Sequence, residues 1–258
     1  MIPLRDSIPA QRRPIVTQAL VAVCAAVFLL QLGAPDMIAR LGMVPARVLD
    51  ADAALTYRQV LGGRIVTLRM PAAWVPDWLT LLTCTFLHGG WLHFLGNMLF
   101  LWIFGDNVED RLGRLGYLGF YLGCGVAASA THLMISPDST VPTIGASGAI
   151  AGVMGAYMLL YPHSRVQMLV FFGFFIDVIV LPAPFFLGYW FLLQLVPGMV
   201  SLGEVGRGGI AFWAHIGGFV VGTAVALLLR RTATLRPAPP GIVLTRRRVR
   251  LRQQDWRS

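Results

Sequence analysis

Long apolar segments, each bounded by glycine, proline or charged residues, follow one another along most of this 258-residue chain. Several approach the roughly 20 residues that an α-helix needs to cross the hydrocarbon core of a bilayer. Hydrophobic residues make up 56% of the sequence and charged residues only 13%, a balance that excludes an ordinary soluble globular domain. The sequence therefore predicts an all-α membrane protein whose chain crosses the bilayer several times.

The apolar segments predict a bundle of six transmembrane helices. We expect these helices at residues 15–32, 91–104, 115–135, 147–161, 185–196 and 209–229. The fifth is short for a span unless it extends back to residue 182, and a loop is expected at 197–208. A charged turn is expected after the second helix, from residue 105 to 114. The hydrophobic pattern of residues 34–77 is too broken for a span, so they are expected to form a long first external loop, either folded or lying at the membrane interface. Residues 165–181 leave three alternatives open: a full span, a re-entrant segment or an interfacial hairpin.

The basic residues predict the orientation of the chain. The formal net charge is +9, every basic residue is an arginine, and many of them lie near the C-terminus. Such a tail could bind nucleic acid, but in a membrane protein it is typical of a cytoplasmic segment lying against anionic lipid. We therefore expect a cytoplasmic N-terminal segment (1–14), a membrane domain (15–231) and a basic cytoplasmic tail (232–258). Five arginines in the 34–77 loop conflict with this orientation, although the rule weakens for a long folded loop.

Four polar residues inside the predicted spans indicate a site: His93, Asn97, Ser147 and His215. Placing a polar side chain within a membrane costs free energy, so such residues usually have a structural or functional role. His93 and Asn97 are four residues apart and share one helix face. The predicted topology brings all four into the outer half of the bilayer. A lone histidine in a span is more often structural or a proton relay, but four such groups at one depth favour a shared function. His88, nearby, either orders the loop above His93 or is a solvated interface residue.

The residue types favour nucleophilic catalysis. Ser147 lies between two glycines, one of them Gly145, at the start of a predicted helix, where free N–H groups and the helix dipole favour negative charge. Small residues at this spacing are equally typical of helix packing. His215 can serve as the base for the Ser147 hydroxyl. His93, Asn97 and the Ser147 N–H can donate hydrogen bonds to an oxyanion. The three cysteines lack metal-ligand spacing, and no metal or other cofactor is expected.

Four motifs carry a resemblance to a known family: HGGWLHFLGN at 88–97, GDNVED at 105–110, GASG at 145–148 and AHIGG at 214–218. With these motifs, the chain resembles a rhomboid intramembrane serine protease over about residues 12–230. The resemblance implies a Ser147–His215 dyad without a third carboxylate, and an oxyanion site that includes His93 and Asn97. It also implies a six-span core, a water-filled cavity open to the outside, and cleavage of the transmembrane segments of membrane proteins near the outer face.

The sequence departs from the rhomboid pattern in three places. Many rhomboids carry Trp-Arg in the first external loop, whereas this chain has Trp78-Leu79. Some relatives place a tyrosine four residues after the serine, stacked on the histidine, whereas this chain has Ala151. His215 must therefore be held by Trp213 or by a neighbouring helix. The 165–181 segment is also longer than in compact members of the family.

Two other functions are compatible with parts of the sequence. A non-catalytic rhomboid-like protein would bind membrane helices without cutting them, and such a protein could dispense with the serine or the histidine. A transporter with a polar site at the midplane is disfavoured because the polar groups cluster near one face. We expect a multi-pass protein of the cell (inner) membrane with both termini in the cytoplasm, whose partners are transmembrane protein substrates and the lipid bilayer, not nucleic acid.

Overall fold

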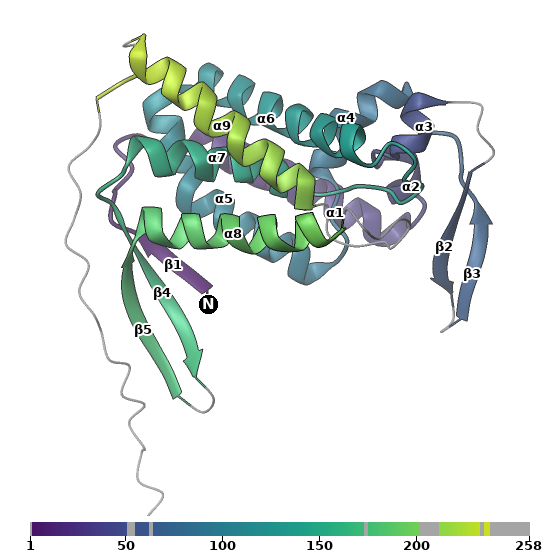
Figure 1. The fold of residues 1–258 in the computed structure, drawn as a ribbon, viewed down its shortest axis with the longest axis horizontal. Helices are drawn as coiled ribbons and strands as arrows, with labels where there is room; N and C mark the ends of the chain where they lie inside the picture. Colours follow the sequence, from purple (N-terminus) through teal and green to yellow (C-terminus); the bar gives the residue numbers. More distant parts are fainter. Residues whose placement is uncertain are drawn as a thin grey trace, which may run out of the picture.

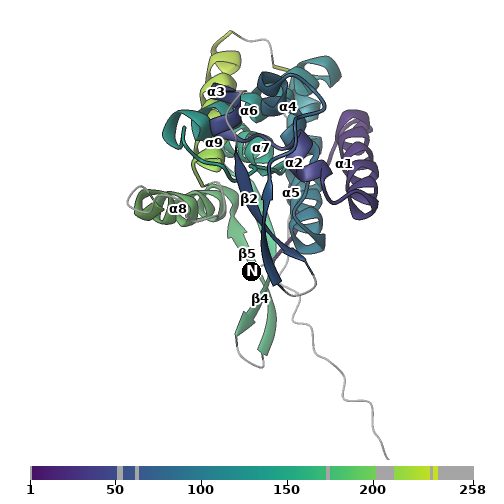
Figure 2. The same ribbon diagram turned by 90° about the vertical axis from the view of Figure 1, so that its right-hand side faces the viewer.

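The computed structural model describes residues 2–50, 55–61, 64–172, 175–201, 212–232 and 235–237. Six long helices form a bundle (Figure 1). They are α1 (Ile15–Gly33), α5 (Trp91–Leu112), α6 (Arg114–Ile135), α7 (Ser147–Leu160), α8 (Ala183–Ser201) and α9 (Phe212–Arg231). Eleven of the fourteen residues of α7 are buried, so α7 is the centre of the bundle. Figure 2 shows that α1 and α8 lie on opposite sides of it.

Three helices, α1, α6 and α9, are long and apolar enough to cross a bilayer. Two shorter apolar stretches lie in α7 and in the Ala183–Met199 part of α8. α5 has 22 residues, but its last turns carry acidic side chains. The described part of the chain is therefore mostly helical with three candidate spans, and the count of six spans stays a prediction.

The prediction that the second helix ends before a charged turn at residue 105 is wrong. α5 continues to Leu112, and the chain turns at Gly113, whose φ of +73° suits glycine. Two acidic side chains in this part of α5, Glu109 and Asp110, bind the segment before α1 and its first turn. Glu109 accepts hydrogen bonds from two backbone N–H groups in the first turn of α1, at 2.8 and 3.0 Å. These N–H groups have no partner within their own helix, so Glu109 caps α1.

The chain is mostly helical, but two small sheets depart from the predicted all-α fold. β4 (Arg165–Phe172) and β5 (Phe175–Pro182) form an antiparallel hairpin, and β1 (Ile2–Asp6) pairs with β4 in the order β1-β4-β5. The β-branched and aromatic residues of this segment favour extended backbone. The apolar side chains of Val166, Met168 and Val170 in β4 are buried, and so is Gln167 between them. Of the three alternatives for residues 165–181, a helical span is excluded and a hairpin is observed.

The long loop between α1 and the second bundle helix is folded, which is one of the two forms expected for it. It contains α2 (Met37–Leu41), α3 (Pro45–Leu49), β2 (Thr56–Leu61) paired with β3 (Arg64–Arg69), η1 (Asp77–Leu79), α4 (Thr80–Thr83) and η2 (Cys84–Phe86). A bridge between Met43 and Thr143 joins this loop to the segment just before α7. The two sheets lie at opposite ends of the bundle (Figure 1).

α8 is longer than the segment predicted at 185–196. It begins at Ala183 and includes Pro197, which was expected to begin a loop, before it ends at Ser201. The remainder of that predicted loop (202–208), the predicted start of the last helix and most of the basic tail lie outside the described residues.

Candidate active site

Two residues that are 68 positions apart in the sequence meet at the start of α7. The Ser147 Oγ and His215 Nε2 atoms are 2.6 Å apart, a hydrogen-bond distance. Ser147 is the first residue of α7, and His215 lies in the first turn of α9. Two helix ends therefore bring the hydroxyl and the imidazole together.

Small residues allow α7 and α9 to approach closely enough for this contact. A Cβ atom at Gly218 of α9 would lie 2.0 Å from the Gly148 carbonyl oxygen of α7, and one at Gly222 would lie 2.2 Å from the Gly152 carbonyl oxygen. Both distances are far below van der Waals contact, so these glycines allow backbone to pack on backbone. The close packing and the serine–histidine contact thus depend on the same pair of helix faces.

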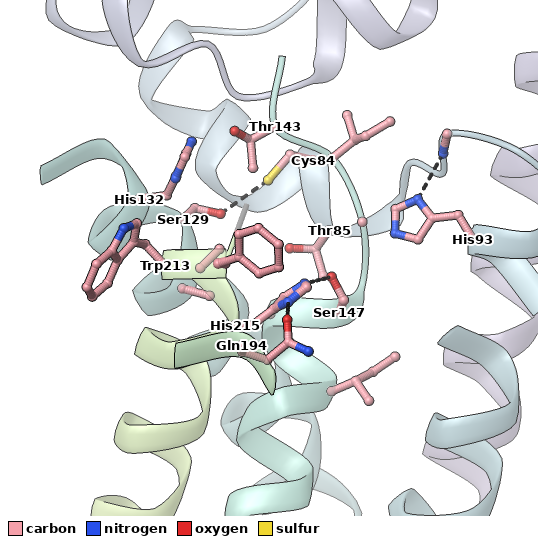
Figure 3. A pocket seen from close by; sticks show the side chains of 18 of the residues that line it. Cys84, Thr85, His93, Ser129, His132, Thr143, Ser147, Gln194, Trp213 and His215 are labelled. Carbon is pink, nitrogen blue, oxygen red and sulfur yellow. Dashed lines mark hydrogen bonds between the residues drawn. The ribbon is translucent and has the colours of Figure 1, made fainter. Parts of the chain in front are cut away.

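His93 lies across Ser147 from His215 (Figure 3). The Gly89 N–H donates a hydrogen bond to His93 Nδ1 at 3.1 Å. Because Nδ1 accepts this bond, the neutral ring carries its proton on Nε2. A Cβ atom at Gly145 would lie 2.9 Å from His93 Nε2 and 3.5 Å from Ser147 Oγ, and the Gly145 φ is +127°. Glycine at this position therefore leaves room for the His93 ring beside Ser147.

Asn97 is buried one turn further along α5. Its amide nitrogen has no hydrogen-bond partner among the residues that the structure describes. A cavity of about 1880 Å³ is lined by Asn97 together with His93, Gly145, Ser147 and His215. The five residues singled out in the sequence thus lie around one space.

Two residues of α8 that the sequence analysis did not weigh contact His215. Gln194 Oε1 lies 2.8 Å from His215 Nδ1, on the side of the ring opposite Ser147 (Figure 3). The Trp190 ring lies one helical turn earlier, with its centroid 5.9 Å from that of the imidazole. Of the two alternatives for holding His215, a neighbouring helix agrees with the structure. A sequence signal was present, because Gln194 is a polar residue within an otherwise apolar segment.

The loop before α5 is bound to α1 through backbone groups of His88. The Gln31 side chain of α1 both accepts from the His88 N–H and donates to the His88 carbonyl oxygen, each at 3.0 Å. His88 is only 1% exposed, so its interpretation as a solvated residue is wrong. Its ring packs edge-on against Phe28, Phe94 and His93. α1 thereby fixes the segment that supplies the Gly89 N–H to His93.

Comparison with known proteins identifies the family of this chain. The family model described as the Rhomboid domain matches residues 75–232, which is more than half of the chain. This chain belongs to the rhomboid family. The match includes all four motifs that carried the resemblance in the sequence.

Several named rhomboids are similar to this chain. Rhomboid-like protein 11, chloroplastic, of Arabidopsis thaliana is 31% identical over 60% of this chain and 54% of its own length. Rhomboid protein 1, mitochondrial, of Saccharomyces cerevisiae is 28% identical over 58% of this chain and 41% of its own length. Rhomboid protease GluP of Bacillus subtilis is 32% identical over 58% of this chain and 27% of its own length. The alignments thus cover between about a quarter and about half of these relatives, and this rhomboid is a membrane protein of that family.

Proposed function

We propose that this rhomboid is an intramembrane serine endopeptidase that cleaves transmembrane segments of membrane proteins near the outer face of the bilayer. The observation that carries the proposal is the 2.6 Å contact between Ser147 Oγ and His215 Nε2 beside a large cavity. A serine hydroxyl is a weak nucleophile until a base removes its proton, and an imidazole at this distance can do so. The protease name of a bacterial relative also supports the proposal.

The two residues perform both halves of the reaction. Ser147 Oγ attacks the carbonyl carbon of the scissile peptide, and its proton passes to His215 Nε2. The tetrahedral intermediate then collapses, the C–N bond breaks, and His215 gives its proton to the leaving amine. A water molecule, deprotonated by His215 in turn, attacks the acyl ester; the ester C–O bond then breaks, His215 returns the proton to Ser147 Oγ, and the second product leaves as a carboxylic acid. A transmembrane helix hides its carbonyl groups in its own hydrogen bonds, so the substrate must unwind before it is cut.

The donors around Ser147 are suited to the negative charge on the intermediate. The His93 ring donates from Nε2 because its Nδ1 is occupied by the Gly89 N–H. The Asn97 amide and the N–H of Ser147, at the first turn of α7, add further donors. Such preorganised donors stabilise a developing oxyanion without reorganising during the reaction.

The ends of the chain support an even number of spans. The Gln11 N–H in the N-terminal segment donates to Asp110, and the Arg236 N–H beyond α9 donates to the Arg111 carbonyl oxygen. Adjacent residues of α5 therefore bind the segment before α1 and the segment just after α9 at one end of the bundle. Together with the arginine-rich tail, this arrangement supports six spans in a cell (inner) membrane with both termini in the cytoplasm.

The test is cleavage of a single-span reporter protein reconstituted with this rhomboid in lipid vesicles. We expect Ser147→Ala to abolish cleavage while the protein remains folded, as judged by its thermal unfolding. Ser136→Ala is a suitable control because Ser136 lines the same cavity from the end of α6. Binding of the reporter without cleavage by the wild-type protein would favour a non-catalytic binder of membrane helices. Undiminished cleavage by Ser147→Ala would exclude the proposed mechanism.

A further inference from the structure

The imidazole of His215 is held at both nitrogens. Its Nε2 lies 2.6 Å from Ser147 Oγ, and its Nδ1 lies 2.8 Å from Oε1 of Gln194. The second partner comes from α8, a helix on which the sequence analysis placed no site residue. Figure 3 shows the imidazole between the serine and the glutamine.

The tautomer of His215 fixes the direction of both hydrogen bonds. To accept the proton of Ser147, Nε2 must present its lone pair, so the neutral ring must carry its hydrogen on Nδ1. The partner of Nδ1 must then be an acceptor, and the amide oxygen of Gln194 is one. Turning the amide over would place its NH₂ group against the Nδ1–H, which is repulsive. The contact with Gln194, with the amide oxygen toward Nδ1, therefore matches the tautomer in which His215 is a base toward Ser147.

We propose that Gln194 is the positioning residue of the serine–histidine pair, a neutral third member that sets the tautomer and the rotation of His215. This inference rests on the proposed function. The Gln194 oxygen also accepts the Nδ1–H of the imidazolium that forms when Ser147 loses its proton. A hydrogen bond to a charged partner is stronger than one between neutral groups.

The residues that position the His215 ring come from α8 and not from α7. Ala151, on the face of α7 one turn after Ser147, is fully buried and offers only a methyl group. Trp190, four residues before Gln194, lies on the same face of α8, and its ring flanks the imidazole at 5.9 Å with an interplanar angle of 39°. Gln194 and Trp190 thus fix the ring in two directions, by a hydrogen bond in its plane and by contact across its face.

Ionisable groups on three other elements face this site. His93 of α5, His132 of α6 and Asp138, from the segment between α6 and α7, line the same cavity as His215. None of the three is altered by a substitution at Gln194. A change in the pH profile on substituting Gln194 therefore reports on the Gln194–His215 contact itself.

The experiment is the rate of covalent labelling by a fluorophosphonate probe, measured in detergent from pH 5 to pH 9. Gln194→Leu keeps a similar volume and removes the acceptor, and we expect it to slow labelling by about 10- to 100-fold, as loss of a hydrogen bond to a charged group does. Gln194→Glu restores the acceptor with a negative charge that favours the imidazolium. It should retain more activity than Gln194→Leu and move the acid limb of the profile about one pH unit or more upward. Leu192→Ala, at an exposed position of α8, is the control and should label like the wild type.

The outcomes separate this inference from the proposed function. Labelling that persists in Ser147→Ala would refute the serine–histidine mechanism and the positioning role with it. Labelling that needs Ser147 but is within about twofold of wild type in Gln194→Leu would overturn the positioning role alone. If Gln194→Leu unfolds, the Gln194→Glu profile decides: an unchanged acid limb overturns the inference, and an upward shift supports it.

Discussion

Substituting Gly218 by alanine should separate α7 from α9 and uncouple Ser147 from His215. The added Cβ would lie 2.0 Å from the Gly148 carbonyl oxygen, whereas ordinary contact begins at 3.4 Å, so the contact must lengthen by about 1.4 Å. If half of that displacement reaches the site, the Oγ–Nε2 distance grows from 2.6 Å to about 3.3 Å, beyond a strong hydrogen bond.

This displacement has two measurable consequences. Overpacking of this kind costs about 1–3 kcal/mol of stability. A misplacement on the order of 1 Å at reacting groups can lower the rate by about 100-fold. Thermal unfolding in detergent and the rate of reporter cleavage measure the two effects. Gly119→Ala in α6 is the matched control, because no atom lies within 4 Å of the added Cβ, and its activity should be unchanged. Wild-type cleavage and stability in Gly218→Ala would refute the argument that this close approach builds the site.

Three further predictions follow from other contacts. Asn97→Ala should reduce the cleavage rate by about 10²- to 10³-fold without unfolding the protein, as the loss of an oxyanion donor does; an unchanged rate would remove Asn97 from the site. Glu109→Ala leaves three donors in the first turn of α1 without their acceptor and should cost about 1–3 kcal/mol in thermal unfolding; equal stability would show that this cap is unimportant. Burial raises the pKa of Asp6 from 3.8 to about 6, so the folded state holds this proton more tightly and wild-type stability should fall as the pH rises from about 4 to 6. The stability of Asp6→Asn should not fall over this pH range. If the difference in stability between the wild type and Asp6→Asn does not change with pH, the raised pKa of Asp6 is contradicted.

The helices and the central contact could be predicted because they follow from simple constraints. The length of a helix that spans a bilayer indicated the apolar segments, and their predicted order of crossing placed the starts of α7 and α9 at one end. That reasoning placed Ser147 with His215 and His93 before any distance was known. The motif residues added the chemical roles.

Other features depend on partners that are distant in the sequence. The charged residues at 105–114 indicated a turn, but Glu109 caps α1 through Thr17, which lies 92 positions away and which no local pattern reveals. His88 is held by Gln31, 57 positions away. The segment 165–181 was ambiguous because a short apolar stretch has no periodicity that separates a strand from a buried helix. Gln194 was missed because its role becomes visible only once α8 lies beside His215.

The most direct test of the serine–histidine pair is mass spectrometry of the protein after reaction with a fluorophosphonate. We expect one adduct per chain, on the peptide that contains Ser147, and we expect it to disappear in His215→Ala while that variant remains folded. An adduct at another residue, or one that forms equally fast without the imidazole, would contradict the assignment of these two residues as nucleophile and base.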